Sequence, residues 1–119
     1  MASLRGYVLR QIASWAILFR RNGLAFACYE RALRNDGNDT ATLAQRAYLH
    51  AQSPAADDRL RAIAGFERVV ALKPGDADTW FNLGFLRQQQ GDHAAAIDAF
   101  ERAVAIREGL DRAWYGLAL

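Results

Sequence analysis

The residues of this chain that could perform chemistry are two histidines, one cysteine and a pair of adjacent aspartates. His50 and His93 lie far apart, and neither has a cysteine or an acid at metal-ligand spacing. Cys28 has no histidine nearby in the sequence to activate it as a nucleophile, so we interpret it as a small buried hydrophobe. Asp57 and Asp58 stand where a helix is expected to begin, and carboxylates there favour the positive end of the helix dipole. We therefore predict no catalytic residue, no metal site and no cofactor.

The sequence also lacks the motifs and the charge pattern of several other functional classes. The sequence has no glycine-rich phosphate loop and no serine-nucleophile motif, so we expect a protein that is not an enzyme. Net charge is +2, but residues 1–36 carry six arginines and two acids (+4), while residues 77–119 carry four arginines and six acids (−2). This mild gradient could bias the approach of a charged partner. It is far from the dense basic stripe of a nucleic-acid binder, so we exclude nucleic acid.

Cysteine content and hydropathy bear on the compartment. A single cysteine cannot form an internal disulfide, which favours a reducing, cytoplasmic location. The most apolar stretch, residues 12–19, is eight residues long, whereas a membrane-spanning helix needs about 20. No small-residue cleavage pattern follows it, so we expect no signal peptide. The strong preference for arginine over lysine, with Lys73 alone, suggests a bacterial source.

The elements that would position any site repeat along the chain. A shift of 34 residues carries Phe66 onto Phe100 and Trp80 onto Trp114, with apolar and charged neighbours matching on both sides. A third copy lies earlier, with Tyr29 in the place of Phe66 and an offset of three residues. Apolar spacing predicts two helices in each copy. The expected helices cover residues 6–20, 24–35, 40–52, 58–72, 77–90 and 93–106, and residues 53–57 form a longer joint that explains the offset.

Small and aromatic residues recur at matching places and predict how the helices pack. Helices approach to about 8 Å only where small side chains face each other. Such residues recur on the first helix of each copy (Ala13, Ala47, Gly84 and Ala118) and on the second helix (Ala25, Ala62 and Ala96). We expect Tyr29, Phe66 and Phe100 to fill the space between the layers.

These residues resemble the tetratricopeptide repeat, whose 34-residue pattern has a Trp, then Leu-Gly, later an Ala, an aromatic residue and a closing Pro. The third copy matches best, with Trp80, Leu83-Gly84, Ala96 and Phe100, and Pro74 matches the closing proline of the second copy. Departures occur elsewhere, because Arg87 replaces an aromatic residue and leucines replace the tryptophan of the first two copies. The resemblance covers about residues 6–119.

The resemblance implies a fold and a domain organisation. We expect an all-α protein, an α-α superhelix that winds as a right-handed solenoid of about three helix pairs plus a C-terminal helix. Residues 1–119 would form one array, with repeats at about 6–39, 40–76 and 77–110 and a partial fourth unit at 111–119. Terminal repeats usually have a polar outer face, and the fourth unit does not, so we expect either a fragment of a longer array or an oligomer contact.

The resemblance also implies a binding site, because the first helix of each repeat lines a concave groove that binds peptides or partner helices. The groove residues expected here are Arg10, Ser14, Gln45, Tyr48, Phe81, Asn82, Phe85, Gln89 and Tyr115. Asn82 resembles an asparagine that bonds the ligand backbone in many family members. Alternatively, Tyr48 and Phe85 pack within the array. The chaperone-tail subfamily clamps a carboxylate with basic residues, and Asp78 stands where that subfamily needs a lysine, so we reject that function.

Three alternatives remain open at the level of the sequence. The chain is a non-catalytic scaffold for protein–protein interaction, a regulatory or targeting module cut from a larger protein that is either an enzyme or not, or a homo-oligomer that associates through its terminal helices. The helix at 6–20 is apolar on more than one side and has flanking arginines. It could lie on a membrane surface, but packing against another protein element is the plainer interpretation.

Overall fold

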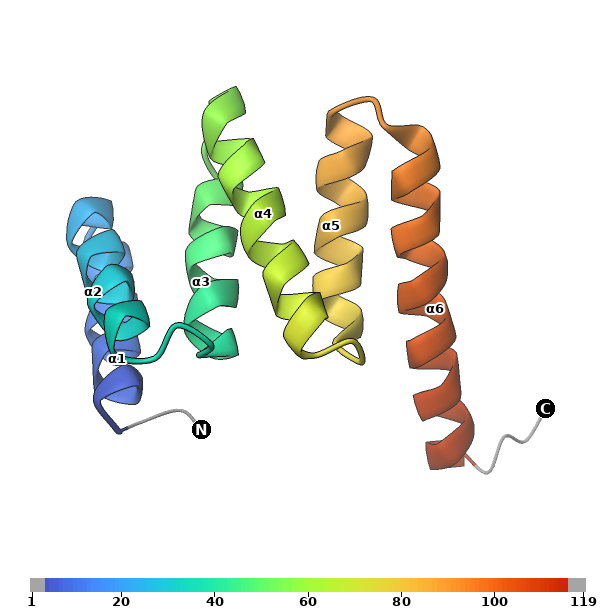
Figure 1. The fold of residues 1–119 in the computed structure, drawn as a ribbon, viewed down its shortest axis with the longest axis horizontal. Helices are drawn as coiled ribbons and strands as arrows, with labels where there is room; N and C mark the ends of the chain where they lie inside the picture. The colour runs from blue at the N-terminus through green and yellow to red at the C-terminus, as the bar shows by residue number, and fades with distance from the viewer. Residues whose placement is uncertain (1–3, 116–119) are drawn as a thin grey trace.

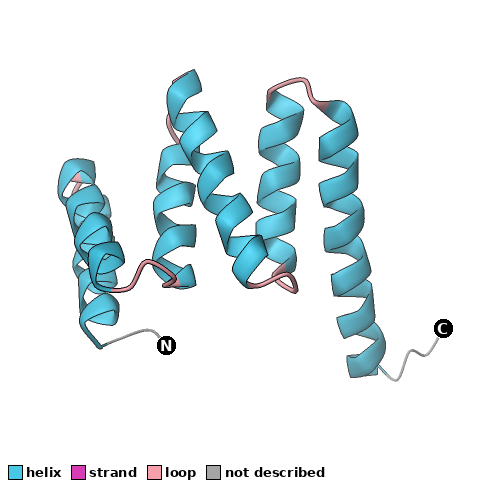
Figure 2. Ribbon diagram, in the orientation of Figure 1, coloured by secondary structure: helices cyan, strands magenta, loops and turns pink. Residues whose placement is uncertain are grey.

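The structure is a computed structural model that describes the backbone of residues 4–115 and the side chains of residues 4–109. Within this range it contains six helices and no strand: α1 (Leu4–Leu18), α2 (Asn22–Asn35), α3 (Thr40–Ala51), α4 (Ala56–Leu72), α5 (Ala77–Gln89) and α6 (His93–Tyr115). The helices form three hairpins that stand side by side in chain order (Figures 1 and 2). The prediction of an all-α helical repeat solenoid is confirmed.

Local sequence sets where the helices begin. Asp39 accepts a hydrogen bond from the backbone N–H of Thr42 at 3.3 Å, and Asp76 accepts one from Thr79 at 3.2 Å. Each carboxylate thus satisfies a backbone donor that the first helical turn leaves free. Between α5 and α6 the chain turns at Gly91, whose φ of +83° lies in the left-handed region that glycine enters without a steric penalty.

The bounds of α1, α2, α3 and α5 lie within two residues of those predicted, and the differences at α4 and α6 have a structural reason. The helix expected at 58–72 begins at Ala56, so the three-residue insertion partly lengthens α4 and does not all enter the loop. Asp57 and Asp58 then lie in its first turn, where the helix dipole favours acids. The predicted helix end at residue 106 is wrong, because α6 continues to Tyr115. No glycine or proline stands between residues 93 and 108 to stop it. The expected contacts of Trp114, Leu117 and Ala118 lie outside the described side chains.

The buried core follows the small-and-large pattern of the repeats. Within the described side chains, the small residues of the first helices and of the second helices are buried, as predicted. Gly84 is needed where it stands, because a Cβ built there would lie 2.5 Å from Cε1 of Phe100. Tyr29 and Phe66 are almost fully buried between hairpins, whereas Phe100 is only half-buried. The layer at the α6 end of the array is therefore less well covered than the two inside it.

Candidate functional site

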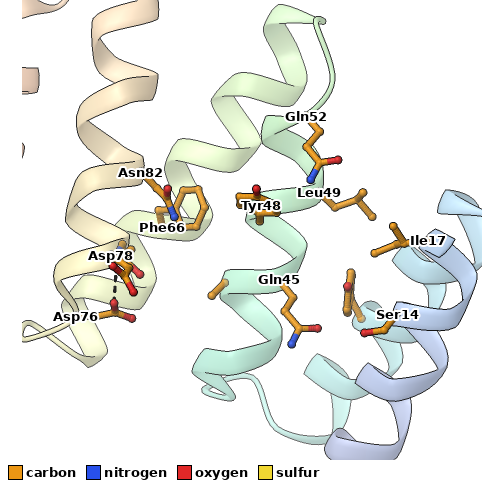
Figure 3. Close-up of a pocket in the computed structure, with 13 residues that line it drawn as sticks. Ser14, Ile17, Gln45, Tyr48, Leu49, Gln52, Phe66, Asp76, Asp78 and Asn82 are labelled. Atoms are coloured by element: carbon orange, nitrogen blue, oxygen red, sulfur yellow. Dashed lines mark hydrogen bonds between the residues drawn. The ribbon is translucent and has the colours of Figure 1, made fainter. Parts of the chain in front are cut away.

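A cavity of about 420 Å³ lies across the first helices of the three hairpins. Most of its lining comes from α1, α3 and α5 (Figure 3), and Phe66 of α4 and Tyr29 of α2 also line it. The cavity is open to solvent on one side, and both apolar and polar side chains line it. The lining includes Ser14, Ile17, Ala44, Gln45, Tyr48, Gln52, Asp76, Asp78 and Asn82. A volume of this size matches the lower range of ligand-binding clefts in proteins.

Four of the residues predicted for the groove line this cavity: Ser14, Gln45, Tyr48 and Asn82. Figure 3 shows that they come from three successive first helices and lie around one space. Tyr48 is 57% exposed, so its ring is available at the cavity and is not part of the core. The amides of Gln45 and Asn82 can each donate and accept hydrogen bonds, which is what recognition of a peptide backbone requires.

Arg10 does not line the cavity, although it was predicted to do so. Its guanidinium donates to Oδ2 of Asp39 at 2.6 Å and to Oγ1 of Thr42 at 3.1 Å. The side chains of Arg10 and Asp39 are only 12% and 2% exposed. Arg10 therefore joins α1 to the beginning of α3 and has a structural role between the first two hairpins.

Phe81 and Phe85 contact α6 and do not line the cavity. Their ring centroids lie 6.2 Å and 5.2 Å from that of Phe100, and the guanidinium of Arg107 lies 5.1 Å from the centre of the Phe81 ring. Gln89 is exposed at the end of α5 and is also absent from the lining. The side chain of Tyr115 lies outside the described side chains. Phe85 thus packs on Phe100 within the array, as the alternative interpretation expects. Its ring nevertheless remains 59% exposed.

Of the two acids in the cavity wall, the sequence pointed to Asp78 at a groove position but did not place Asp76 there. Asp76 and Asp78 line the cavity at the beginning of α5, and the described lining contains no arginine or lysine. Asp78 also pairs with Arg107 at 2.6 Å, but its side chain is 85% exposed, so water screens that pair. A signal was present in the sequence, because both aspartates stand at the start of a helix expected to line the groove. Two carboxylates therefore lie at the α5 end of the cavity.

The histidines and the cysteine behave as packing or surface residues. The ring of His50 stacks on Phe26 with 4.5 Å between centroids, and burial lowers the pKa of His50, although Asp58 at 3.5 Å opposes that shift. Cys28 is buried, and His93 is exposed at the beginning of α6. Among the described residues, no group of three or more His, Cys, Asp or Glu is placed to hold a metal ion.

No helix within residues 4–115 combines the length and the apolar character that a bilayer-spanning segment needs.

Comparisons with known proteins agree with this architecture. The family model described as "Tetratricopeptide repeat" matches residues 54–113. A search of curated protein sequences found no match. Among solved structures, one of MamA aligns with a TM-score of 0.78 at 18% identity over 96% of this chain, and a second aligns with 0.82 at 15% over 90%. The chain spans about 60% and 61% of the length of those MamA chains.

A third solved structure carries a ligand. It is the first tetratricopeptide repeat domain of Spaghetti (RPAP3) bound to the HSP90 peptide SRMEEVD. It aligns with a TM-score of 0.77 at 17% identity, over 98% of this chain and 93% of that one. Likeness at these identities shows the shared fold, and the family match covers half of the sequence. The chain belongs to the tetratricopeptide repeat family.

Proposed function

We propose that this chain is a non-catalytic scaffold that binds an extended peptide or a helix of a partner protein in the cavity across α1, α3 and α5. The observation that carries the proposal is the convergence of Ser14, Gln45, Tyr48 and Asn82 from three separate helices around one open space. Amide and hydroxyl groups next to an exposed aromatic ring suit a ligand that has both a polar backbone and apolar side chains.

The charge of the cavity wall narrows the class of partner. Asp76 and Asp78 line the α5 end, so an acidic peptide would meet like charge there. A neutral or basic segment would gain from the same carboxylates. The peptide in the Spaghetti (RPAP3) structure contains two glutamates and an aspartate. We infer that this chain selects the opposite charge, which agrees with the rejection of a chaperone-tail function.

A capture experiment tests the location of the site. The wild-type chain and a Tyr48→Ala/Asn82→Ala variant are immobilised and exposed to cell extract. The matched control is Leu60→Ala, which removes a side chain that is 55% exposed on α4 and does not line the cavity. Proteins that the wild type and Leu60→Ala both capture, and that the double variant loses, support the proposal. Equal capture by all three chains places the binding site outside the cavity.

A second measurement tests the charge preference. The captured proteins are presented as overlapping peptides on an array, and bound segments are compared by net charge. We expect bound segments to be neutral or basic, and Asp78→Asn to weaken the basic ones most. A preference for acidic segments would refute the inference about charge while leaving the location of the site intact.

A further inference from the structure

The outer face of α1 is exposed at positions that are buried in the two later repeats. Trp15 occupies the place of Leu49 in α3 and of Leu86 in α5, since the repeats are offset by 34 and then 37 residues. Leu49 and Leu86 are each 5% exposed, whereas Trp15 is 64% exposed. Val8 is 45% exposed, and its equivalent Thr42 is fully buried. In α3 and α5 this face is covered by the hairpin that precedes the helix, whereas none of the described residues 4–115 covers the same kind of face on α1.

Exposed apolar side chains follow one another along α1 at a spacing of three or four residues. Their exposed fractions reach 78% at Leu4 and 73% at Leu18, and the turn after α1 adds Phe19 at 61%. Exposed apolar patches of this extent on a folded protein mark interaction surfaces. The members of this patch, called the α1 face below, are Leu4, Val8, Ile12, Trp15, Leu18 and Phe19.

The opposite end of the array has a complementary exposed face on α6. Val104 is 52% exposed, whereas its equivalent Val70 is 8% exposed because α5 packs over it. Ile97 is 59% exposed, and its equivalent Ile63 packs against the core that α4 and α5 share. Figure 1 places α1 and α6 at opposite ends of the array. The residues Ile97, Phe100 and Val104, called the α6 face below, therefore correspond to the surface on α4 that receives the next hairpin.

We propose that the α1 face of one copy of this chain docks on the α6 face of a second copy, so that the solenoid continues from molecule to molecule. The packing would repeat the contact already present within the chain, where Leu86 of α5 joins Phe66 and Val70 of α4 in one core cluster. Such a contact is heterologous, so it can propagate and does not stop at a dimer. It uses surfaces outside the peptide cavity and does not depend on the proposed function.

Charge favours the same pairing of ends. Residues 1–36 carry +4, and residues 77–119 carry −2. Copies that associate head to tail bring opposite ends together, whereas copies that pair through two α1 faces bring two positive ends together. An anionic membrane surface would attract the arginines near α1 as well, but it would leave the exposed α6 face unexplained.

The experiment is sedimentation equilibrium of the 119-residue chain over a range of concentrations. The first variant, Trp15→Gln, damages the α1 face, and the second, Ile97→Gln/Val104→Gln, damages the α6 face. Leu60→Gln is the control, because Leu60 is similarly exposed but lies on α4, in the middle hairpin of the array. All substituted residues are more than half exposed, so thermal unfolding followed by circular dichroism is expected to show that each variant folds.

We expect the wild type and Leu60→Gln to form species whose mean mass rises with concentration, and raised salt to weaken them. Each face variant alone should weaken association by about 30-fold, the effect typical of a buried aromatic anchor. Mixing the two face variants should restore one intact contact. The mixture is then expected to give a 1:1 species of twice the 13.2 kDa chain mass that grows no further.

Three results would overturn the proposal. The first is a wild type that stays monomeric up to about 1 mM. The second is self-association of the Ile97→Gln/Val104→Gln variant into a dimer that Trp15→Gln abolishes, since that pattern indicates pairing of two α1 faces. The third is a monomer that binds anionic lipid vesicles and loses this binding in Trp15→Gln, since that indicates a membrane surface as the occupant.

Discussion

Replacing Arg10 by methionine should destabilise the fold far more than removing an exposed arginine that makes an ion pair of the same length. Arg10 meets Asp39 at 2.6 Å, and Arg107 meets Asp78 at 2.6 Å. The two pairs differ in their surroundings. The side chains of the first pair are 12% and 2% exposed, and those of the second are 51% and 85% exposed. The two ion pairs thus have the same N–O distance and differ in how far their side chains are exposed to solvent.

The expected magnitude follows from the carboxylate that Arg10→Met leaves behind. Removing one partner of a buried ion pair costs about 3–5 kcal/mol, because the remaining charge is buried without compensation. Asp39 keeps its hydrogen bonds from the N–H and hydroxyl of Thr42, so we expect the lower end, about 3 kcal/mol. For a chain of this length that loss lowers the melting temperature by roughly 12 °C. Arg107→Met should cost less than about 1 kcal/mol.

The assay is urea unfolding followed by circular dichroism at the helix band, with the free energy extrapolated to water. A double-mutant cycle with Asp39→Asn measures the interaction energy between Arg10 and Asp39. We expect a coupling of about 2 kcal/mol, because with the neutral amide of Asp39→Asn, removal of Arg10 leaves no buried charge. If Arg10→Met and Arg107→Met cost the same, burial does not strengthen the Arg10–Asp39 pair. The structural role given to Arg10 would then be wrong, and the absence of Arg10 from the cavity lining would need another explanation.

Three further predictions concern the packing of the core, the glycines of α5 and α6, and the titration of His50. Phe66→Ala should lose about 3–5 kcal/mol of unfolding free energy in urea, because Phe66 is 1% exposed between two hairpins. Gly84→Ala should destabilise by about 1–3 kcal/mol through its clash with the Phe100 ring, whereas Gly109→Ala, with open space around it, should stabilise α6 by up to about 1 kcal/mol. Burial lowers the pKa of His50 below its ordinary 6.5, so the unfolded chain binds a proton there first as pH falls. Unfolding free energy measured by urea titration should therefore decrease as pH drops below about 6.5 towards the lowered pKa, and His50→Gln should remove that decrease.

The repeat period made most of the fold predictable. A 34-residue shift aligns large residues with large ones and small with small, and a hairpin can stack on a copy of itself only when those sizes match. The predicted burial of Ala13, Ala47 and Gly84 is confirmed for that reason. The end of α6 was not predictable in the same way, because Glu108 stands in the place of Pro74, while the period alone suggested a break after residue 106.

The candidate site was predictable only in part, because a shared position in the repeat does not fix what a side chain contacts. Ser14, Gln45 and Asn82 are short or polar and stay at the cavity. Phe81 finds a larger apolar partner in Phe100, and its burial against that ring outweighs exposure to the groove. The family pattern predicts that all four residues face the groove. Contacts with the neighbouring hairpin decide which of them line the cavity.

One position explains why the cavity is open beside the beginning of α5 and why carboxylates line it there. Arg10, Ala44 and Phe81 occupy the same place in successive first helices. At the first junction the arginine fills the space and pairs with the capping carboxylate of Asp39. At the second junction Ala44 is too small to do either, so it lines an open cavity together with Asp76, which caps α5 as Asp39 caps α3. Alanine in the place of arginine thus leaves open space beside α5, with the Asp76 carboxylate in the cavity wall.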